Sequence, residues 1–292
     1  MSLHEPDIGM SDQRAPPLRN AMTIDVEDYF QVSAFAPHID RASWPTRECR
    51  VEANVELVLS MLAQAKVHAT FFALGWIAER YPAMIRRIVA GGHELASHGY
   101  GHLRANLQTR AEFSTDVALS KSILEDIGGQ AVRGYRAPSF SIGAGNLWAL
   151  DTLFEAGYEY SSSIYPIAHD HYGMPEANRF AFHPNGAAGL LELPPTTLRI
   201  MNKNFPAGGG GYFRFFPYTF SRWMIERVNT VDRQASIFYF HPWELDPEQP
   251  RPPGLDLRTH FRHYLNLSRM EGRLRRLMKD FHWDRIDRIF LA

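Results

Sequence analysis

Hydrophobic positions along most of the chain follow two alternating patterns, one typical of strands and one typical of helices. Val55, Val58 and Leu62 recur at helical spacing, whereas 67–74 is a mostly apolar segment rich in β-formers. These patterns predict strands at 21–24, 67–74, 93–98, 132–135, 158–162 and 236–240, and helices at 52–65, 77–90, 113–127 and 146–156. Strands that alternate with helices are typical of βαβ units around a parallel sheet or barrel, so the pattern predicts an α/β fold.

Three parts of the chain depart from this alternation. Residues 1–19 are polar and contain three prolines, and we expect them to form a disordered arm. Residues 165–235 are rich in Pro, Gly and aromatic residues, which favours an irregular region of loops and short strands. Residues 246–292 are expected to be a C-terminal extension with a basic helix at 258–280. We therefore expect one domain over residues 20–292.

Composition excludes several classes of protein. The 292 residues include 31 Lys and Arg and 32 Asp and Glu, so the formal net charge of −1 gives no electrostatic basis for binding nucleic acid. A single cysteine, Cys49, excludes an internal disulfide framework and a zinc site of clustered cysteines. No apolar segment is long enough for a membrane span, and the polar N-terminus does not resemble a signal peptide. We therefore expect a cytoplasmic protein.

Side chains that can bind a metal follow two of the predicted strands. Asp25, Glu27 and Asp28 come after the first strand, and carboxylates this close repel one another unless they are solvated or share a cation. His98 and His102 lie in a glycine-containing loop after the strand at 93–98. Two imidazoles and one carboxylate form a common catalytic metal site. Taken alone, the acidic triplet favours an ordinary polar loop, and a single pair of histidines four apart is often a coincidence.

Two further polar residues also come at strand ends. Arg136 is followed by Pro138 in a rigid turn, and an arginine there can orient a carboxylate through paired hydrogen bonds. His241 follows the apolar strand at 236–240, and its ordinary pKa suits a general acid. Each residue alone is also compatible with a structural role. The carboxyl ends of parallel strands meet at one edge, which is where active sites of such folds are built.

The order of these groups resembles the polysaccharide deacetylases, the NodB-homology family also called carbohydrate esterase family four. The family motif T-F-D-D-G has a variant counterpart in Thr23–Asp28, and H-S/T-x-x-H corresponds to His98–His102. The R-x-P motif corresponds to Arg136–Pro138, and the histidine of the last motif corresponds to His241. The likeness extends over residues 21–245.

Three segments are similar to one branch of this family, the deacetylases found with bacterial exopolysaccharide gene clusters, which carry a C-terminal extension. These segments are Asp25–Phe30, Gly208–Arg214 and His241–Leu245. The resemblance implies an α/β fold of the NodB type, a distorted (β/α) barrel of seven strands with an irregular insertion and a C-terminal helix.

The resemblance also implies catalytic roles. Asp25 would be the general base, oriented by Arg136, and His241 would be the general acid. His98, His102 and Glu27 would hold the metal. Glu27 is two residues after Asp25, and residues two apart on a strand face the same side, so both carboxylates could reach one site. Asp28 remains an alternative ligand. The fourth family motif has no clear match near 158–163, so the contact that orients the catalytic histidine is not assigned.

The implied activity is metal-dependent removal of N-acetyl groups from amino sugars of a bacterial polysaccharide, either an exopolysaccharide or a peptidoglycan-like polymer. Zn²⁺ is the expected metal, with Co, Ni, Fe and Mn as alternatives. The partner would be an N-acetylated glycan and not a nucleic acid, and a homo-oligomer is compatible with the sequence. Two other functions remain open: an allantoinase-like ureide or cyclic-imide amidohydrolase on the same fold, and an inactive glycan-binding homologue.

Several residues are candidates for contact with the substrate. Backbone N–H groups of Tyr29 or of 135–138 would bind the oxyanion, Leu193 would line the acetyl pocket, and two aromatic side chains would stack on a sugar ring. A packing role is an alternative for Leu193, and packing is the more frequent role of such aromatic side chains. The complete set of candidates is Tyr29, Tyr135, Pro138, Leu193, Tyr212 and Trp243.

Overall fold

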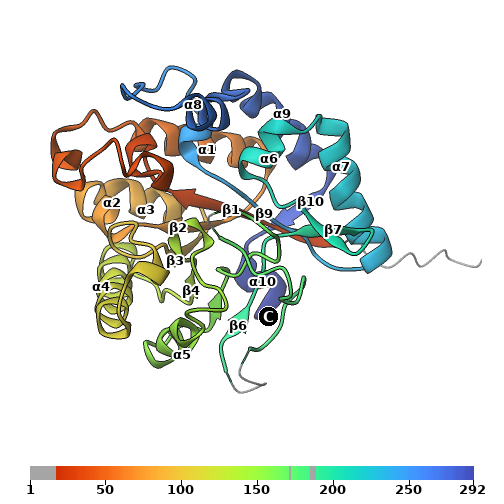
Figure 1. The fold of residues 1–292 in the computed structure, drawn as a ribbon, viewed down its shortest axis with the longest axis horizontal. Coiled ribbons are helices and arrows are strands. Elements are labelled where there is room, and N and C mark those ends of the chain that lie inside the picture. Colours follow the sequence, from red (N-terminus) through yellow and green to blue (C-terminus); the bar gives the residue numbers. More distant parts are fainter. Residues whose placement is uncertain (1–17, 171, 185–188) are drawn as a thin grey trace, which may run out of the picture.

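Seven parallel strands form a curled sheet in the computed structural model, which describes residues 18–170, 172–184 and 189–292 (Figure 1). Along the sheet the order is β9 (Ile237–Phe240), β1 (Arg19–Val26), β2 (Thr70–Ala73), β3 (Glu94–Ser97), β4 (Gly134–Tyr135), β5 (Tyr160–Ser161) and β6 (Leu191–Glu192). The α/β prediction is confirmed, and so is the distorted seven-stranded arrangement.

Strand β1 lies at the centre of the sheet and pairs along both of its edges. Thr23 lies opposite Thr70 of β2 on one edge and opposite Tyr239 of β9 on the other. An eighth strand, β10 (His282–Asp284), pairs with the first residues of β1 on the β2 edge. Residues near both ends of the described chain therefore meet on one strand.

The register aligns the carboxyl ends of neighbouring strands. Val26 pairs with Ala73, Ala73 with Ser97, and Ser97 with Tyr135. The residues that follow these strands therefore begin at one edge of the sheet. Glu27, Asp28, His98, His102 and Arg136 are among them, and Asp25 is the last residue but one of β1 itself.

A seam between β6 and β9 distorts the barrel. No strand ladder among the described residues joins these two strands; instead, Thr196 donates its N–H to Ile237 O and Tyr239 donates its N–H to Gly208 O. Gly209 has φ +114, and a Cβ there would lie 2.0 Å from the carbonyl oxygen of Tyr239. Only glycine allows the backbones to approach this closely.

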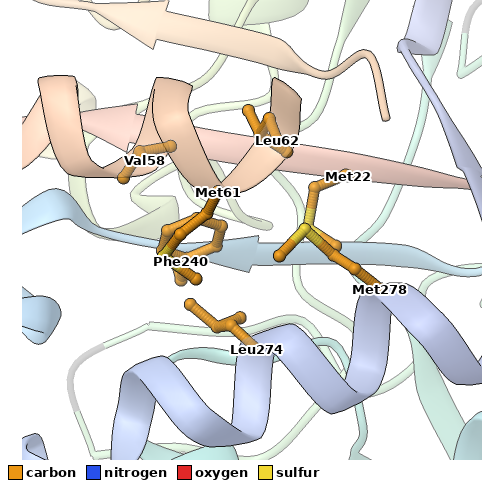
Figure 2. Close-up of a pocket in the computed structure, with 7 residues that line it drawn as sticks. All are labelled: Met22, Val58, Met61, Leu62, Phe240, Leu274 and Met278. Carbon is orange, nitrogen blue, oxygen red and sulfur yellow. The ribbon is translucent and has the colours of Figure 1, made fainter. Parts of the chain in front are cut away.

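Helices cover the outer face of the sheet beside β1 and β9. α1 (Val51–Ala65) and α9 (Leu267–Asp280) pack there, and Figure 2 shows their side chains meeting Met22 of β1 and Phe240 of β9. The cavity between them is about 10 Å³, which is no more than the space of one water molecule. This region is therefore part of the packed core and not a ligand site.

Two predicted helices are each divided in two. The helix expected at 77–90 is α2 (Gly75–Arg80) followed by α3 (Pro82–Ala90), because Pro82 disfavours the helical conformation at Tyr81. The helix expected at 258–280 is α8 (Leu257–Tyr264) followed by α9, and Asn266 between them has φ +56. The helices α4 (Arg110–Gly128) and α5 (Trp148–Glu155) lie where the sequence predicts helices.

The region at 165–235 is more regular than expected. It contains the hairpin of β7 (Thr197–Ile200) and β8 (Lys203–Pro206), and the helices α6 (Gly210–Phe215) and α7 (Tyr218–Arg227). Most of the predicted N-terminal arm lies outside the described residues, but Arg19 already belongs to β1. The C-terminal strand β10 and helix α10 (Ile286–Phe290) were not predicted. None of the helices in the described ranges is both long and apolar enough to cross a bilayer.

Candidate metal and catalytic site

Three buried side chains from two strand ends form the candidate metal site. Glu27 follows β1, and His98 and His102 follow β3. One ligand atom from each lies within 4.8 Å of the other two, and this is the group of metal-binding side chains found among the described residues. Two imidazoles and a carboxylate leave positions open for water and substrate, which is typical of catalytic rather than structural metal sites.

The loop that carries the two histidines has a tight turn at Gly99, whose backbone conformation and close contacts favour glycine. Gly99 has φ +77, and a Cβ there would lie 2.9 Å from Oδ2 of Asp116. The Asp116 carboxylate accepts the N–H of Tyr100. At the first turn of α2, Gly75 donates its N–H to Gly99 O. The short turn brings the second imidazole back to the first, with 5.3 Å between ring centroids.

Hydrogen bonding leaves one nitrogen of His98 free. Its Nδ1 lies 2.8 Å from Arg136 O and must donate to that carbonyl, so Nε2 is the unprotonated nitrogen. Burial lowers the pKa of His98 to about 4, which keeps the ring neutral. A neutral imidazole with its second nitrogen bonded to a carbonyl is the usual form of a histidine ligand.

The carboxylate of Glu27 fits a bound cation. Its Oε2 is buried and makes no hydrogen bond, although it lies 2.7 Å from Nε2 of His102. Its other oxygen accepts from the indole N–H of Trp243. A buried carboxylate oxygen without a donor is unfavourable in a metal-free protein, whereas a shared metal ion satisfies both it and the nearby nitrogen. The donor set therefore fits a divalent cation.

Arg136 holds Asp25 from inside the barrel. The fully buried guanidinium donates through Nη1 to Asp25 Oδ1 at 2.6 Å and to Thr23 Oγ1 at 2.8 Å. It also donates to the carbonyl and hydroxyl oxygens of Ser162, and it lies over the ring of Phe72. Oδ2 of Asp25 remains free on the side of His241, 3.9 Å from its Nε2. One carboxylate oxygen is thus anchored and the other faces the site.

His241 is the most exposed member of this group, with 19% of its side chain accessible. Its Nδ1 lies 2.8 Å from Oε1 of Glu244, in the short helix η7 (Pro242–Leu245), and its Nε2 lies 3.4 Å from Oε1 of Glu27. Burial lowers the pKa of His241, but the carboxylates of Glu27 and Glu244 outweigh burial and raise it to about 9. The ring is therefore protonated at neutral pH.

The interaction between Glu27 and the neighbouring imidazoles also lowers the pKa of Glu27. Burial alone would raise the pKa of Glu27, but the imidazoles of His102 and His241 hold it well below its ordinary value. The carboxylate is thus ionised at neutral pH and is available as a ligand.

The structure directs Asp28 away from the metal-binding group. Its carboxylate accepts the backbone N–H groups of Tyr29, Arg50 and Val51, which caps the short helix η1 (Tyr29–Gln31) and the start of α1. Burial raises the pKa of Asp28 to about 6 despite these hydrogen bonds. The alternative in which Asp28 binds the metal is therefore not supported, because its oxygens serve as helix caps.

Several of the side chains expected to contact the substrate are buried and not accessible to it. Leu193 is fully buried with Phe72 and Tyr160 inside the barrel and cannot line an acetyl pocket. Trp243 is 5% exposed, and its two faces are covered by His241 and His263, so it cannot stack on a sugar.

The residues expected to bind the oxyanion are also buried, and several of their backbone N–H groups already donate hydrogen bonds within the protein. The side chain of Tyr135 points into the core against Phe113, Tyr29 is 3% exposed, and Pro138 is buried. The N–H of Tyr29 is used by Asp28, and the N–H groups of Arg136 and Ala137 are used by Ser97 O and Ser163 Oγ. Tyr212 is half-buried beside the aromatic cluster of Tyr239 and remains a candidate.

Sequence reasoning missed the residues that support His241. Glu244 lies three residues after the histidine, at the spacing of a capping box, and this spacing was the available signal. Arg214, which is 2% exposed, pairs with Glu244 at 2.5 Å across 30 positions of sequence, and no local pattern reveals such a contact.

Comparison with known protein families divides the chain near residue 161. The family described as polysaccharide deacetylase matches residues 42–161, and a domain of unknown function (DUF3473) matches residues 162–291. A peptidoglycan-N-acetylglucosamine deacetylase of Bacillus cereus is 33% identical over 98 residues, which are 33% of this chain and 36% of that protein. A chitooligosaccharide deacetylase of Bradyrhizobium sp. is 35% identical over 153 residues, 52% of this chain and 65% of that protein. The chain thus spans less than two thirds of the length of these relatives.

A solved structure supports the same fold. A Mycobacterium smegmatis protein described as a candidate polysaccharide deacetylase superimposes with a TM-score of 0.61 at 19% identity, over 94% of this chain and 92% of that one. At this identity the likeness concerns the fold alone. Together with the family match and the relatives, these findings identify a polysaccharide deacetylase (NodB-homology) domain over residues 42–161 of the chain.

Proposed function

We propose that this protein is a metal-dependent hydrolase that removes N-acetyl groups from the amino sugars of a bacterial polysaccharide and releases acetate. One observation carries the proposal: a buried Glu27–His98–His102 group lies beside a carboxylate anchored by arginine and a partly exposed histidine. These are the three elements of metal-dependent amide hydrolysis, namely a metal site, a base and an acid.

The metal would be held by Glu27, His98 and His102, and two imidazoles with one carboxylate favour Zn²⁺, with Co, Ni, Fe or Mn as substitutes. When bound, a divalent cation lowers the pKa of a water molecule towards about 7 and polarises the acetyl carbonyl. The residues around it supply the remaining chemistry.

Asp25 acts as the general base through its free oxygen. Arg136 occupies Oδ1, so Oδ2 is the atom that takes the proton of the attacking water. The buried guanidinium fixes the direction of the carboxylate, which reduces the reorganisation needed during attack.

His241 acts as the general acid. Amine expulsion from the tetrahedral intermediate requires a proton on the sugar nitrogen. In the imidazolium form of His241, Nδ1 donates its proton to Glu244 and Nε2 carries a second proton that can be transferred. Its partial exposure places this proton where a glycan can reach it. Tyr212 is the aromatic residue that remains available to contact a sugar ring.

Two features support a glycan as the substrate. The named relatives act on peptidoglycan and chitooligosaccharides, and both are polymers or oligomers of N-acetylated sugars. The segments at 25–30, 208–214 and 241–245 are similar to the exopolysaccharide branch of the family. We propose an N-acetylated exopolysaccharide as the polymer, with peptidoglycan fragments as the alternative that the test distinguishes.

The test measures acetate released from N-acetylated chitooligosaccharides, peptidoglycan fragments and a partly acetylated exopolysaccharide. We expect a chelator to abolish release and Zn²⁺ or Co²⁺ to restore it. His241→Ala should lower turnover by roughly 10²- to 10⁴-fold with metal content unchanged, because the acid is lost but no ligand is. His260→Ala, which removes an imidazole from α8 outside the site, is the matched control and should retain wild-type turnover.

Acetate release that is indifferent to chelation would remove the metal from this scheme. Hydrolysis of ureides or cyclic imides without activity on any glycan would instead support the amidohydrolase alternative.

A further inference from the structure

The carboxylate of Glu244 connects His241 to a second buried charge. Its Oε1 accepts from Nδ1 of His241 at 2.8 Å and from the backbone N–H of His241 at 3.0 Å. Its Oε2 accepts from Nε of Arg214 at 2.5 Å, and Glu244 itself is fully buried. Both oxygens therefore have fixed partners, and the carboxylate has a single orientation.

Arg214 ties this carboxylate to the end of α8. Its Nη1 donates to the carbonyl oxygens of His263 and Leu265 at 2.7 and 2.8 Å, and its Nη2 donates to Arg262 O at 3.2 Å. The last carbonyls of a helix lack partners within the helix and carry partial negative charge. The guanidinium therefore neutralises Glu244 and caps α8 at the same time.

The same helix also holds the ring plane of His241. His263 of α8 stacks on Trp243 with 4.2 Å between centroids, and Trp243 stacks on His241 with 5.1 Å between centroids. The indole N–H of Trp243 donates to Glu27, which orients the stack relative to the metal-binding group. His241 is thus fixed in its plane by stacking and in its tautomer by Glu244.

All of these supporting residues lie within residues 162–291, the region matched as a domain of unknown function. We propose that Arg214 is a positioning residue for His241, and that through Glu244 it makes the end of α8 a structural part of the deacetylase site. The catalytic consequence rests on the proposed function, because it assumes that His241 donates a proton to the leaving amine.

The proposal predicts that Arg214 affects turnover only through His241. Arg214→Met should lower kcat by about 10-fold or more, bounded by the roughly 10²- to 10⁴-fold loss expected when the acid itself is removed. KM and metal content should stay at wild-type values, because Arg214 contacts neither the metal-binding residues nor an exposed surface.

A double-mutant cycle provides the decisive measurement. In a His241→Ala background, Arg214→Met should have no further effect on kcat, because there is no imidazole left to position. A purely structural role would reduce kcat equally in both backgrounds and would overturn the proposal. Arg179→Met is the matched control, since Arg179 also pairs with a carboxylate and a carbonyl, at Asp232 and Thr197, and should leave kcat unchanged.

A second readout does not depend on deacetylase activity. In ¹⁵N NMR of histidine side chains, His241 should show one tautomer, with the proton on Nδ1 when the ring is neutral, and Arg214→Met and Glu244→Gln should each produce a mixture. If Arg214→Met does not fold, Arg214→Lys tests the same point, because a lysine cannot bridge Glu244 and three carbonyls. An unchanged tautomer in these variants would contradict the proposal even if the protein is an active deacetylase. A single tautomer in an inactive wild-type protein would contradict only the proposed function.

Discussion

Two buried glutamates, at opposite ends of the same barrel, have opposite electrostatic environments. Glu27 lies at the carboxyl ends of the strands among imidazoles, and its pKa is held well below the ordinary value. Glu94, at the start of β3, accepts hydrogen bonds from the neutral hydroxyls of Thr70 and Tyr160 and from the N–H of Asp287. Burial and the charge of Asp287 raise the pKa of Glu94 to about 7.

Burial alone therefore does not identify a functional carboxylate. Cationic or metal-bound neighbours keep Glu27 charged, whereas neutral donors leave Glu94 close to its protonated form. The Glu94 group has a structural role, because it attaches α10 to the barrel: Asp287 donates to Glu94, and Ile286 donates to Thr70. Matched substitutions at Glu27 and Glu94 can therefore distinguish a functional from a structural carboxylate.

The largest expected difference is in activity. Glu27→Gln removes an anionic ligand, and we expect bound metal to be lost and turnover to fall by more than about 10²-fold, since even outer partners of metal ligands are worth roughly 10- to 100-fold. Glu94→Gln is the matched variant and should retain turnover and metal. Acetate release and metal analysis of both proteins check this expectation. Equal losses in the two variants would mean that the two groups do not differ in function.

Arg136 should give the largest effect on stability. Arg136→Leu leaves Asp25 buried without its cation, so the free energy of unfolding should fall by about 3–5 kcal/mol. Arg133→Leu is the control, because Arg133 pairs with Glu159 at the surface and such pairs contribute at most about 1 kcal/mol. Denaturant titration at pH 7 measures both. A small loss in Arg136→Leu would show that water or another group compensates for the missing guanidinium.

Glu94 should make stability depend on pH. Below about pH 4.5 its carboxyl is protonated in both the folded and the unfolded chain, so it has no pH-dependent effect. Between about 4.5 and 7 the unfolded chain releases the proton and the folded chain keeps it, so the free energy of unfolding falls as pH rises. The full decrease corresponds to roughly 3 kcal/mol and is complete above pH 7.

The amide of Glu94→Gln does not titrate, so this variant should lack that decrease. Urea titrations of wild type and variant from pH 4 to 8 measure the difference between them. A difference that stays constant across this range would show that Glu94 has an ordinary pKa in the folded protein.

The smallest effect is expected at Thr70. Its hydroxyl donates to Glu94 at 2.6 Å and accepts the N–H of Ile286 at 2.8 Å, so Thr70→Val should destabilise the fold by about 1–2 kcal/mol without changing turnover. Thr115→Val, on the exposed side of α4, should change stability by no more than about 0.5 kcal/mol. Thermal unfolding of both variants, with turnover measured in parallel, checks the comparison.

The sequence predicted most of the sheet, because strand and helix patterns are local and strong. It predicted one helix where Pro82 makes two, and it missed α6 and α7 because aromatic and glycine residues hide helical periodicity. Six residues could be grouped because each lies at or just after the end of a strand, and these ends lie at the same edge: Asp25, Glu27, His98, His102, Arg136 and His241.

Contacts that join distant segments could not be predicted in this way. The pairing of Arg214 with Glu244 depends on where α6 and α8 dock, and the burial of Leu193 and Trp243 depends on tertiary packing. The residues predicted to bind metal or transfer protons do lie at strand ends. The aromatic and apolar residues predicted to contact the substrate are mostly part of the core.

The central position of β1 has a consequence for how the protein is made. Thr23 of β1 donates its hydroxyl to Phe238 O, 215 residues later in the sequence. At translation rates of about 5–20 residues per second, β1 is synthesised roughly 10–40 s before its partner β9 emerges from the ribosome. Two of the candidate catalytic carboxylates, Asp25 and Glu27, are thus synthesised well before the strand that completes their surroundings.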